Sequence, residues 1–232
     1  MGERMKRETV AEREEQRSEQ TAAAKERGAE KKRLRAAALE KRDSLTAQQR
    51  KRYSDSIIKK LTSLPCYRDA DAVLTYISFR SEVDTMPLTK QAFAEGKAVF
   101  APKVAGKEME FYRIFSLDDL SAGYRGIMEP AGGQSIAAWM MDDGRTTFPH
   151  LLICMPGAAF DKERHRIGYG GGFYDRYVSR LLQKSEHMDA AGHSQVKVST
   201  AALAYDCQIF EEIPWEAHDI RPARVITEID MI

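Results

Sequence analysis

The residues best suited to chemistry are gathered in one glycine-rich stretch of the chain. Gly168 and residues 170–172 place four glycines within five positions, directly before a predicted helix that begins at about Phe173. Because glycines lack Cβ atoms, their backbone amides can approach a ligand closely. Free N–H groups and the dipole at a helix N-terminus favour an anion. The stretch is therefore suited to binding phosphate.

Two charged side chains flank these glycines. Arg166 carries a planar guanidinium that matches phosphate oxygens. Asp175 falls in the first turns of the predicted helix, where a carboxylate oxygen could hold Mg²⁺ against a triphosphate. The pattern is neither a Walker A motif, because no Gly-Lys-Ser/Thr follows, nor a Rossmann fingerprint. A glycine cluster can also be a tight turn, and Asp175 an N-terminal helix charge, so on chemistry alone both interpretations stay open.

Other residues that could bind a ligand also have ordinary structural interpretations. Lys31 and Arg35 lie four positions apart, which fits a solvated basic helix face. Glu82 could cap the helix that follows it. Asp219 could be a turn residue, and Ile77 could simply belong to the core.

Cysteine and histidine patterns suggest neither covalent catalysis nor a metal centre. The three cysteines are widely spaced and odd in number, which argues against a disulfide framework or a structural zinc site. Cys154 lies in the apolar run 151–155, as is typical of a buried, inert thiol. His150, His165 and His218 do not form a convincing nucleophile–base set.

The helices expected to position these residues have clear boundaries. Thr46 and Gln49 form a capping-box pattern, and the helix that they open ends before Pro65. A second helix places Leu88, Ala92 and Phe93 inward and stops at Gly96. A third is expected over residues 173–182, followed by a polar surface loop at 184–198.

Apolar runs and alternating patterns predict the strands. The expected strands are residues 73–77, 98–101 (closed by Pro102), 109–114, 151–155, 201–205 and 225–229. Because these strands alternate with helices and several are wholly apolar, they predict an α/β fold. We expect a three-layer α/β/α domain with a largely parallel mixed sheet.

The chain length of 232 residues allows one domain and an extension. Residues 1–28 are rich in Glu, Arg, Lys, Gln and Ala and show no apolar face. They predict a charged N-terminal extension, either a solvated helix or a disordered tail. Residues 29–232 are expected to form a single α/β domain.

Charge and hydropathy narrow the classes of partner. A formal net charge of +1 gives no reason to expect nucleic acid or an anionic membrane. The charged N-terminus lacks the apolar segment of a signal peptide, and no apolar stretch approaches the roughly 20 residues of a membrane helix. We expect a soluble, cytoplasmic protein that acts on small molecules as a monomer or weak homodimer.

Several motifs together resemble one known family. Residues 156–161, followed by Arg-Ile-Gly-Tyr-Gly-Gly-Gly-Phe-Tyr-Asp-Arg at 166–176, resemble the signature of the 5-formyltetrahydrofolate cyclo-ligases, also called 5,10-methenyltetrahydrofolate synthetases. Further motifs follow in the family's order from about residue 31 to 229. They are Lys31-x-x-Leu34-Arg35, Tyr76-x-Ser78, Glu82-Val83-Asp84-Thr85, Pro102-Lys103, Met109, Gly126-Ile127-Met128-Glu129-Pro130 and Pro214-x-x-x-His218-Asp219.

The resemblance implies an ATP- and Mg²⁺-dependent ligase that cyclises 5-formyltetrahydrofolate to 5,10-methenyltetrahydrofolate, with release of ADP and phosphate. It also implies the layered superfold of NagB/RpiA/CoA-transferase-like proteins. Two rivals remain at this stage. A sugar-phosphate isomerase or CoA-transferase would need a carboxylate as base or nucleophile, for which Glu82 is the tempting candidate. The other rival is a non-catalytic folate or nucleotide sensor.

Roles for individual positions also follow from the resemblance. Arg166 would be the catalytic residue. ATP would be bound by Lys31, Arg35, Arg166, Ile167, Gly168, Tyr169, Gly170, Gly171, Gly172, Phe173 and Tyr174. The folate would be bound by Arg35, Ile77, Glu82, Tyr169 and Phe173, and Mg²⁺ by Asp175 and Asp219. Aromatic faces suit a flat pterin, and a carboxylate suits its donor-rich edge.

The sequence departs from the usual family pattern at three positions. Arg164 stands where a glycine is common, so the turn there needs another geometry. Phe173 replaces a frequent Tyr, which removes a hydroxyl and keeps the ring. Ala223 stands where an Asp is frequent, which puts a second C-terminal carboxylate in doubt.

Overall fold

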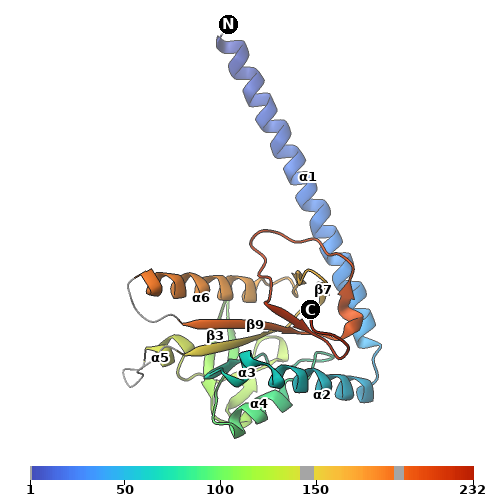
Figure 1. The fold of residues 1–232 in the computed structure, drawn as a ribbon. Helices are drawn as coiled ribbons and strands as arrows, with labels where there is room; N and C mark the ends of the chain where they lie inside the picture. Colours follow the sequence, from blue (N-terminus) through green and yellow to red (C-terminus); the bar gives the residue numbers. More distant parts are fainter. Residues whose placement is uncertain (1, 142–148, 191–195) are drawn as a thin grey trace.

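The computed structural model describes the backbone of residues 2–141, 149–190 and 196–232, and side chains within residues 17–141, 149–183 and 196–232. A long first helix, α1 (Gly2–Asp43), extends away from a layered body and reaches it with its C-terminal half (Figure 1). Residues 17–29 of this helix are exposed, and burial begins at Glu30. The predicted boundary near residue 28 therefore lies within a continuous helix, not at a break in the chain.

The body is built around a six-stranded sheet with the order β11-β9-β6-β1-β2-β3. Every neighbouring pair is parallel except β2 and β3, which form an antiparallel edge. The strands are β1 (Ala72–Leu74), β2 (Ala98–Ala105), β3 (Glu108–Ile114), β6 (His150–Met155), β9 (Lys197–Leu203) and β11 (Arg224–Ile226). The structure confirms the predicted mixed α/β fold with a mostly parallel sheet.

Helices cover both faces of this sheet because the central strands are apolar on both sides. Val73 belongs to one buried cluster, whereas its neighbours Ala72 and Leu74 belong to the other, as the two-residue period of a strand requires. The first cluster packs against α2 (Ala47–Ser63), α3 (Pro65–Arg68) and α4 (Met86–Ala94). The second packs against α5 (Ile136–Met140) and α6 (Phe173–Ala190).

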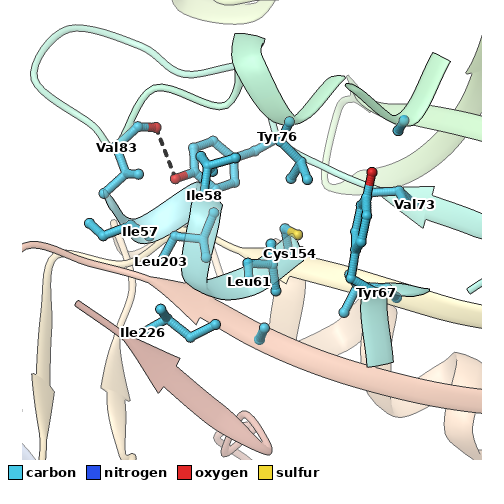
Figure 2. Packing of buried hydrophobic residues seen from close by; sticks show 14 of the residues in the cluster. Ile57, Ile58, Leu61, Tyr67, Val73, Tyr76, Val83, Cys154, Leu203 and Ile226 are labelled. Atoms are coloured by element: carbon cyan, nitrogen blue, oxygen red, sulfur yellow. Dashed lines mark hydrogen bonds between the residues drawn. The ribbon is translucent and has the colours of Figure 1, made fainter. Parts of the chain in front are cut away.

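Figure 2 shows the first cluster, in which α2 meets the sheet. Ile57 and Leu61 of α2 are fully buried beside Leu203 and Ile226 of the sheet. The Tyr76 hydroxyl donates a hydrogen bond to the Val83 carbonyl, 3.1 Å away, and so closes the segment that follows β1. Burying a phenol ring is favourable when its hydroxyl keeps a partner.

Two predicted helix boundaries are confirmed. Thr46 caps α2 through a capping box with Gln49, and the helix ends at Ser63, before Pro65. Gly96 follows α4 with a φ of +72°, the left-handed conformation that glycine adopts at helix C-termini. The predicted inert thiol is also confirmed, because Cys154 is fully buried and burial raises its pKa.

Other predicted boundaries are wrong. The strand expected at 73–77 ends at Leu74, and the strand expected to close at Pro102 continues to Ala105. Because β1 pairs with β2 only as far as Phe100, Pro102 has a sheet neighbour on one side alone, where a missing N–H is tolerated.

Later boundaries differ as well. The strand expected at 225–229 is shorter and runs only from Arg224 to Ile226. The expected surface loop at 184–198 is wrong at both ends, because α6 continues to Ala190 and β9 begins at Lys197. Residues 191–195 of that prediction lie outside the described part of the chain.

A smaller sheet with the order β10-β7-β8 joins α1 to the body. Its strands are β7 (Ala159–Asp161), β8 (Arg166–Ile167) and β10 (Ile209–Phe210). Leu34 and Ala38 of α1 are buried against Ala159, Ile167 and Ile213 in a third apolar cluster. The remaining elements are β4 (Leu120–Ala122), β5 (Met128–Pro130) and the short 3₁₀ helices Leu117–Asp119, Tyr124–Gly126 and Asp206–Gln208.

Strand order indicates where a ligand should bind. From β1 the chain moves to β2 on one side, and β6 then pairs with β1 on the other side. The order therefore reverses between β1 and β6, and ligands of open α/β sheets bind at the carboxyl ends of the strands at such a point. Residues 75–85 follow β1, and Pro156 follows β6. Among the described residues, no helix is long and apolar enough to cross a membrane.

Candidate active site

Arg166 is at the centre of the predicted site. Its strand, β8, pairs with β7, and its side chain is only 3% exposed. One guanidinium nitrogen donates to the Pro156 carbonyl at 3.1 Å, and the other to Asp175 Oδ1 at 2.6 Å. Arg166 Nε is buried without a hydrogen-bond partner among the described residues. The guanidinium is therefore fixed in orientation, and its Nε–H donor stays unpaired among the described residues.

Asp175 connects the glycine-rich segment to the C-terminal part of the chain. It lies in the first turn of α6, and its Oδ1 also accepts a hydrogen bond from the Ile220 amide at 3.0 Å. Ile220 directly follows Asp219, the other predicted metal ligand. The structure thus places Arg166, Asp175 and the 219–220 backbone at one corner.

The glycine loop, defined here as residues 168–172, precedes α6 as predicted. Gly170 and Gly172 have φ values of +98° and +63°, which disfavour side chains. A Cβ at Gly171 would lie 2.6 Å from the Phe173 ring. The loop therefore depends on glycine for its path into the N-terminus of α6, where backbone amides can bind an anion.

The predicted basic residues of α1 reach this corner from the side. Arg35 Nε donates to the Gly168 carbonyl at 2.7 Å. Lys31 Nζ lies 2.7 Å from Asp219 Oδ2 and 2.9 Å from Glu216 Oε2. Burial opposes the charge of Lys31, but the hydrogen bonds to these two carboxylates raise its pKa overall. α1 is therefore tied to both the glycine loop and the C-terminal segment.

Carboxylates gather around Asp219. Ligand atoms of Glu216, His218 and Asp219 lie within 4.8 Å of one another, so this group could hold a metal ion. Asp219 Oδ2 also accepts from the Glu216 amide at 2.9 Å, a contact typical of a turn aspartate. The hydrogen bond from Lys31 lowers the pKa of Glu216. Both the metal interpretation and the turn interpretation of Asp219 fit this geometry.

The predicted folate residues Glu82 and Tyr169 meet on the other side of the glycine loop. The Tyr169 hydroxyl accepts a 2.6 Å hydrogen bond from Arg42 Nη1. Its interaction with the Glu82 carboxylate lowers the pKa of Glu82. Glu82 Oε2 accepts from the Phe79 amide at 2.9 Å. Burial raises the pKa of Glu82, an effect that these hydrogen bonds and the positive charge of Arg42 oppose.

Glu82 does not cap the helix that follows it, as one interpretation of the sequence had it. α4 has Thr85 at its N-cap without a side-chain cap, and Asp84 Oδ1 accepts from the Met86 amide instead. The carboxylate of Glu82 is instead directed at the Phe79 amide and Tyr169.

The remaining predicted residues differ in how they are placed. Phe173 packs edge-on against Tyr124, with ring centroids 6.2 Å apart. The Tyr174 hydroxyl is buried and has no hydrogen-bond partner among the described residues. Ile77 is 6% exposed and belongs to the first apolar cluster, as its interpretation as a core residue expects. Ile167 is likewise buried, under α1, in the third cluster.

Arg164 departs from the family pattern at a position with a glycine-like backbone. Its φ is +67° in the turn between β7 and β8, which explains why a glycine suits this position. Its Nε is buried without a hydrogen-bond partner among the described residues. Ala223, another of the three departures, donates its amide to Thr200 Oγ1 at 2.9 Å.

Reasoning from the sequence missed two residues of this site, Arg42 and Glu216. Arg42 is 4% exposed and contacts Tyr169, and Glu216 pairs with Lys31. A signal for Arg42 was available, because Arg35 and Arg42 are seven residues apart and so lie two turns apart on one helix face. Glu216 had no comparable signal.

Comparisons with known proteins identify the family of the chain. A 5-formyltetrahydrofolate cyclo-ligase from Mus musculus is 29% identical over 84% of this chain and 92% of its own length. A probable 5-formyltetrahydrofolate cyclo-ligase from Schizosaccharomyces pombe is 34% identical over 76% of this chain and 87% of its own.

A solved structure is similar as well. The NMR structure of Aquifex aeolicus 5,10-methenyltetrahydrofolate synthetase matches with a TM-score of 0.67 and 34% identity, over 87% of this chain and 91% of that one. The model of the 5-formyltetrahydrofolate cyclo-ligase family matches residues 27–228, which include the site residues on α1, the glycine loop and the C-terminal segment. The chain therefore belongs to the 5-formyltetrahydrofolate cyclo-ligase family.

Proposed function

We propose that the corner formed by Arg166, the glycine loop and Asp175 is the ATP site of a 5-formyltetrahydrofolate cyclo-ligase, and that Glu82 and Tyr169 bind the folate beside it. As a member of the family, the chain is an ATP-dependent cyclo-ligase of folate metabolism. The observation that carries the site assignment is the fixed Arg166 guanidinium, which has a free buried donor next to a glycine-built helix N-terminus.

The chemistry begins from a poor leaving group, the formyl oxygen of 5-formyltetrahydrofolate. This oxygen attacks the γ-phosphorus of ATP, and ADP leaves. N10 of the same folate then attacks the formyl carbon, the carbon–oxygen bond breaks, and phosphate departs with that oxygen while N10 loses its proton. These reaction steps need no nucleophile from the protein. The protein therefore contributes by positioning the substrates and by stabilising the charge that develops.

Arg166 is suited to the transferred phosphoryl group. Its guanidinium orientation is set by Pro156 and Asp175, so little reorganisation is needed as negative charge moves from ATP to the formyl oxygen. The glycine loop adds backbone amides, and Lys31 and Arg35 add positive charge from α1. Ile167, Phe173 and Tyr174 complete the proposed ATP-binding segment.

Mg²⁺ fits the donor set of this corner. Asp175 and Asp219 provide carboxylate oxygens, the ligands that Mg²⁺ prefers, and Oδ1 of Asp175 bonds to the residue after Asp219. When bound, Mg²⁺ neutralises charge on the phosphates. Arg166, through its hydrogen bond to Asp175, would keep that carboxylate oriented.

The folate half of the site uses shape and hydrogen bonding. Glu82 accepts hydrogen bonds from a pterin edge in its ionised form, and the rings of Tyr169 and Phe173 offer flat faces. Arg35 lies between the two halves, because it bonds to the Gly168 carbonyl. Ile77 would contribute an apolar wall from the segment that follows β1.

The superfold, the cellular location, the oligomeric state and the domain division are further proposals. We propose that the fold belongs to the NagB/RpiA/CoA-transferase-like superfold. Its mostly parallel sheet, with helices on both faces, supports this proposal. A cytoplasmic location and a monomeric or weakly dimeric state remain predictions, as does the division into residues 1–28 and 29–232.

The direct test is absorbance of 5,10-methenyltetrahydrofolate formed from 5-formyltetrahydrofolate, with and without ATP and Mg²⁺. We expect product only when ATP and Mg²⁺ are both present, with ADP and phosphate formed in equal amounts. Folate binding without any methenyl product would support the sensor interpretation. Turnover of a sugar phosphate or a CoA thioester instead would support the rival enzyme classes.

A further inference from the structure

Arg42 is a buried cation that the proposed reaction does not yet use. It lies in the last turn of α1 and is 4% exposed. Its Nε donates to Ser81 Oγ at 3.0 Å, and its Nη1 donates to the Tyr169 hydroxyl at 2.6 Å. One side chain thereby joins α1, residues 75–85 after β1, and the glycine loop.

The neighbours of Arg42 strengthen this junction. Ser81 Oγ also donates to the carboxylate of Asp43, so two consecutive residues of α1 bind the same hydroxyl. Tyr169 in turn interacts with Glu82 and lowers the pKa of its carboxylate, and the Arg42 guanidinium carbon lies 5.8 Å from the Tyr169 ring centroid. The order of contacts is thus Arg42 to Tyr169 to Glu82.

Anchoring α1 does not by itself require a buried arginine. Leu34 and Ala38 already bury one face of the helix in the third apolar cluster, and Arg35 bonds to Gly168. Removing a guanidinium from water is costly, and an apolar residue of similar size often stabilises a protein equally well. Arg42 bonds instead to Tyr169, a candidate substrate residue, and to Ser81, the neighbour in sequence of Glu82. This buried arginine is therefore better explained by the site than by packing.

We propose that Arg42 is a positioning residue for the folate half of the site, which holds Tyr169 and Glu82 in the geometry and charge state that bind the pterin. The inference rests on the proposed folate role of those two residues. Arg42 acts through Tyr169 and touches no reacting atom.

Four charged or titratable groups surround the Glu82 carboxylate in the described part of the chain. They are Arg42 from α1, Tyr169 from the glycine loop, Tyr76 after β1 and Tyr174 from α6. Arg42 is the cation among them, and it opposes the rise in the pKa of Glu82 that burial causes. Without that positive charge the pKa of Glu82 rises further, so the carboxylate is protonated at a higher pH.

The experiment compares Arg42→Gln, Arg42→Lys and a control, Arg33→Gln, in the full chain. Arg33 is a matched control because it is on the same helix with a 69% exposed side chain and pairs only with the nearby Glu30 among the ion pairs of the described residues. For Arg42→Gln we expect KM for 5-formyltetrahydrofolate to rise by about 10- to 100-fold, with KM for ATP within about twofold, as loss of a charged hydrogen bond predicts. Arg33→Gln should leave both unchanged.

A pH profile distinguishes positioning from mere structural support. The acid limb of kcat/KM for the folate should move to higher pH in Arg42→Gln, because Glu82 is then protonated at higher pH. Arg42→Lys keeps the charge and should leave the limb near that of the parent, although KM rises. A purely structural defect would reduce the amount of active protein without moving the limb.

A second variant covers the case in which Arg42→Gln does not fold. Tyr169→Phe keeps the ring and removes the hydroxyl that links Arg42 to Glu82, so it should raise KM for the folate in the same direction. This inference alone is overturned if the parent forms product but Arg42→Gln shows an unchanged KM for the folate and an unchanged acid limb. If Arg42→Gln is unfolded, the same result in Tyr169→Phe overturns it. No methenyl product from the parent overturns the proposed function first, and this inference with it.

Discussion

Arg166 is restrained by its neighbours, and this decides which substitution is informative. The Pro156 carbonyl and Asp175 fix both terminal nitrogens of its guanidinium. A lysine would keep the charge but could not form this two-pronged arrangement. The role of the residue is thus testable by geometry as well as by charge.

We predict that Arg166→Lys lowers kcat more than it weakens ATP binding, because the lost contact is made chiefly in the transition state. The loss should be on the order of 2–4 kcal/mol of transition-state stabilisation, or about 10²- to 10³-fold in kcat. Steady-state turnover over a range of ATP concentrations measures both quantities. Arg166→Ala should lower kcat and also weaken ATP binding, and the double variant with Arg164→Ala should lose more activity than either single variant. Parental turnover by Arg166→Ala would refute the phosphate role of the loop.

Asp175 offers a cleaner charge test, because asparagine preserves its shape. The side-chain oxygen of the asparagine could still accept hydrogen bonds from Arg166 and from the Ile220 amide, as Asp175 Oδ1 does. Asp175→Asn should therefore fold normally, lose most activity and need about tenfold or more Mg²⁺ for half-maximal rate. The measurement is turnover against Mg²⁺ concentration at saturating ATP.

The matched control for Asp175 is Asp55→Asn, an aspartate of α2 that is 49% exposed and paired with Lys51. It should leave the Mg²⁺ requirement unchanged. An unchanged requirement in Asp175→Asn as well would remove Asp175 from the metal site.

At the residue scale, the sequence predicted several residues that the structure brings together, and their roles in binding stay predictions. Arg166 and Asp175, nine positions apart, do pair, and Glu82 and Tyr169 do meet. The pairing of Lys31 with Asp219 was not foreseen, because it joins residues 188 positions apart through the fold of the C-terminal segment. Long-range contacts of this kind depend on tertiary packing, which no local pattern encodes.

At the scale of elements, the glycine loop and α6 act as one unit. Gly172 has a φ of +63°, and its carbonyl accepts a hydrogen bond from the Arg176 amide in the first turn of α6. An alanine there must adopt a left-handed conformation at a cost of about 1–2 kcal/mol. The backbone amides of the loop would shift with it.

We predict that Gly172→Ala raises KM for ATP by several-fold beyond its effect on stability. The control is Gly96→Ala, whose φ of +72° imposes the same kind of strain in open space after α4. Both variants should lose about 1–2 kcal/mol of unfolding free energy in denaturant titrations. If neither Gly172→Ala nor Gly96→Ala changed the KM for ATP, the loop amides would not bind the nucleotide.

Element boundaries were predicted best where a local cap decides them. The Thr46–Gln49 box and Gly96 fixed the ends of α2 and α4. Strand ends were harder, because β2 is extended by its antiparallel pairing with β3, well past Pro102. The end of α6 was missed because its last turns are polar and resemble a loop in composition.

At the scale of the whole molecule, α1 both extends from the body and contributes residues to the proposed site. Residues 17–29 are exposed, whereas Lys31 and Arg35 contact the C-terminal segment and the glycine loop, and Leu34 is buried between them. The part of the helix that contacts the rest of the chain therefore begins close to Glu30, and the family model matches from residue 27.

We predict that deleting residues 2–28 leaves the melting temperature nearly unchanged and turnover within about twofold of the parent, since residues 17–28 are exposed and the sequence of the segment shows no apolar face. The test is thermal unfolding and methenyl-folate formation over a range of ATP concentrations. Its counterpart is the double change Lys31→Gln with Arg35→Gln in the full chain, which keeps Leu34 and the apolar contact of α1. That variant should fold but show an ATP KM raised by about tenfold or more, because two cations of the proposed nucleotide site are lost. If instead the deletion raises the ATP KM as much as the double change does, the functional part of α1 begins before Glu30 and the boundary at residue 28 is wrong.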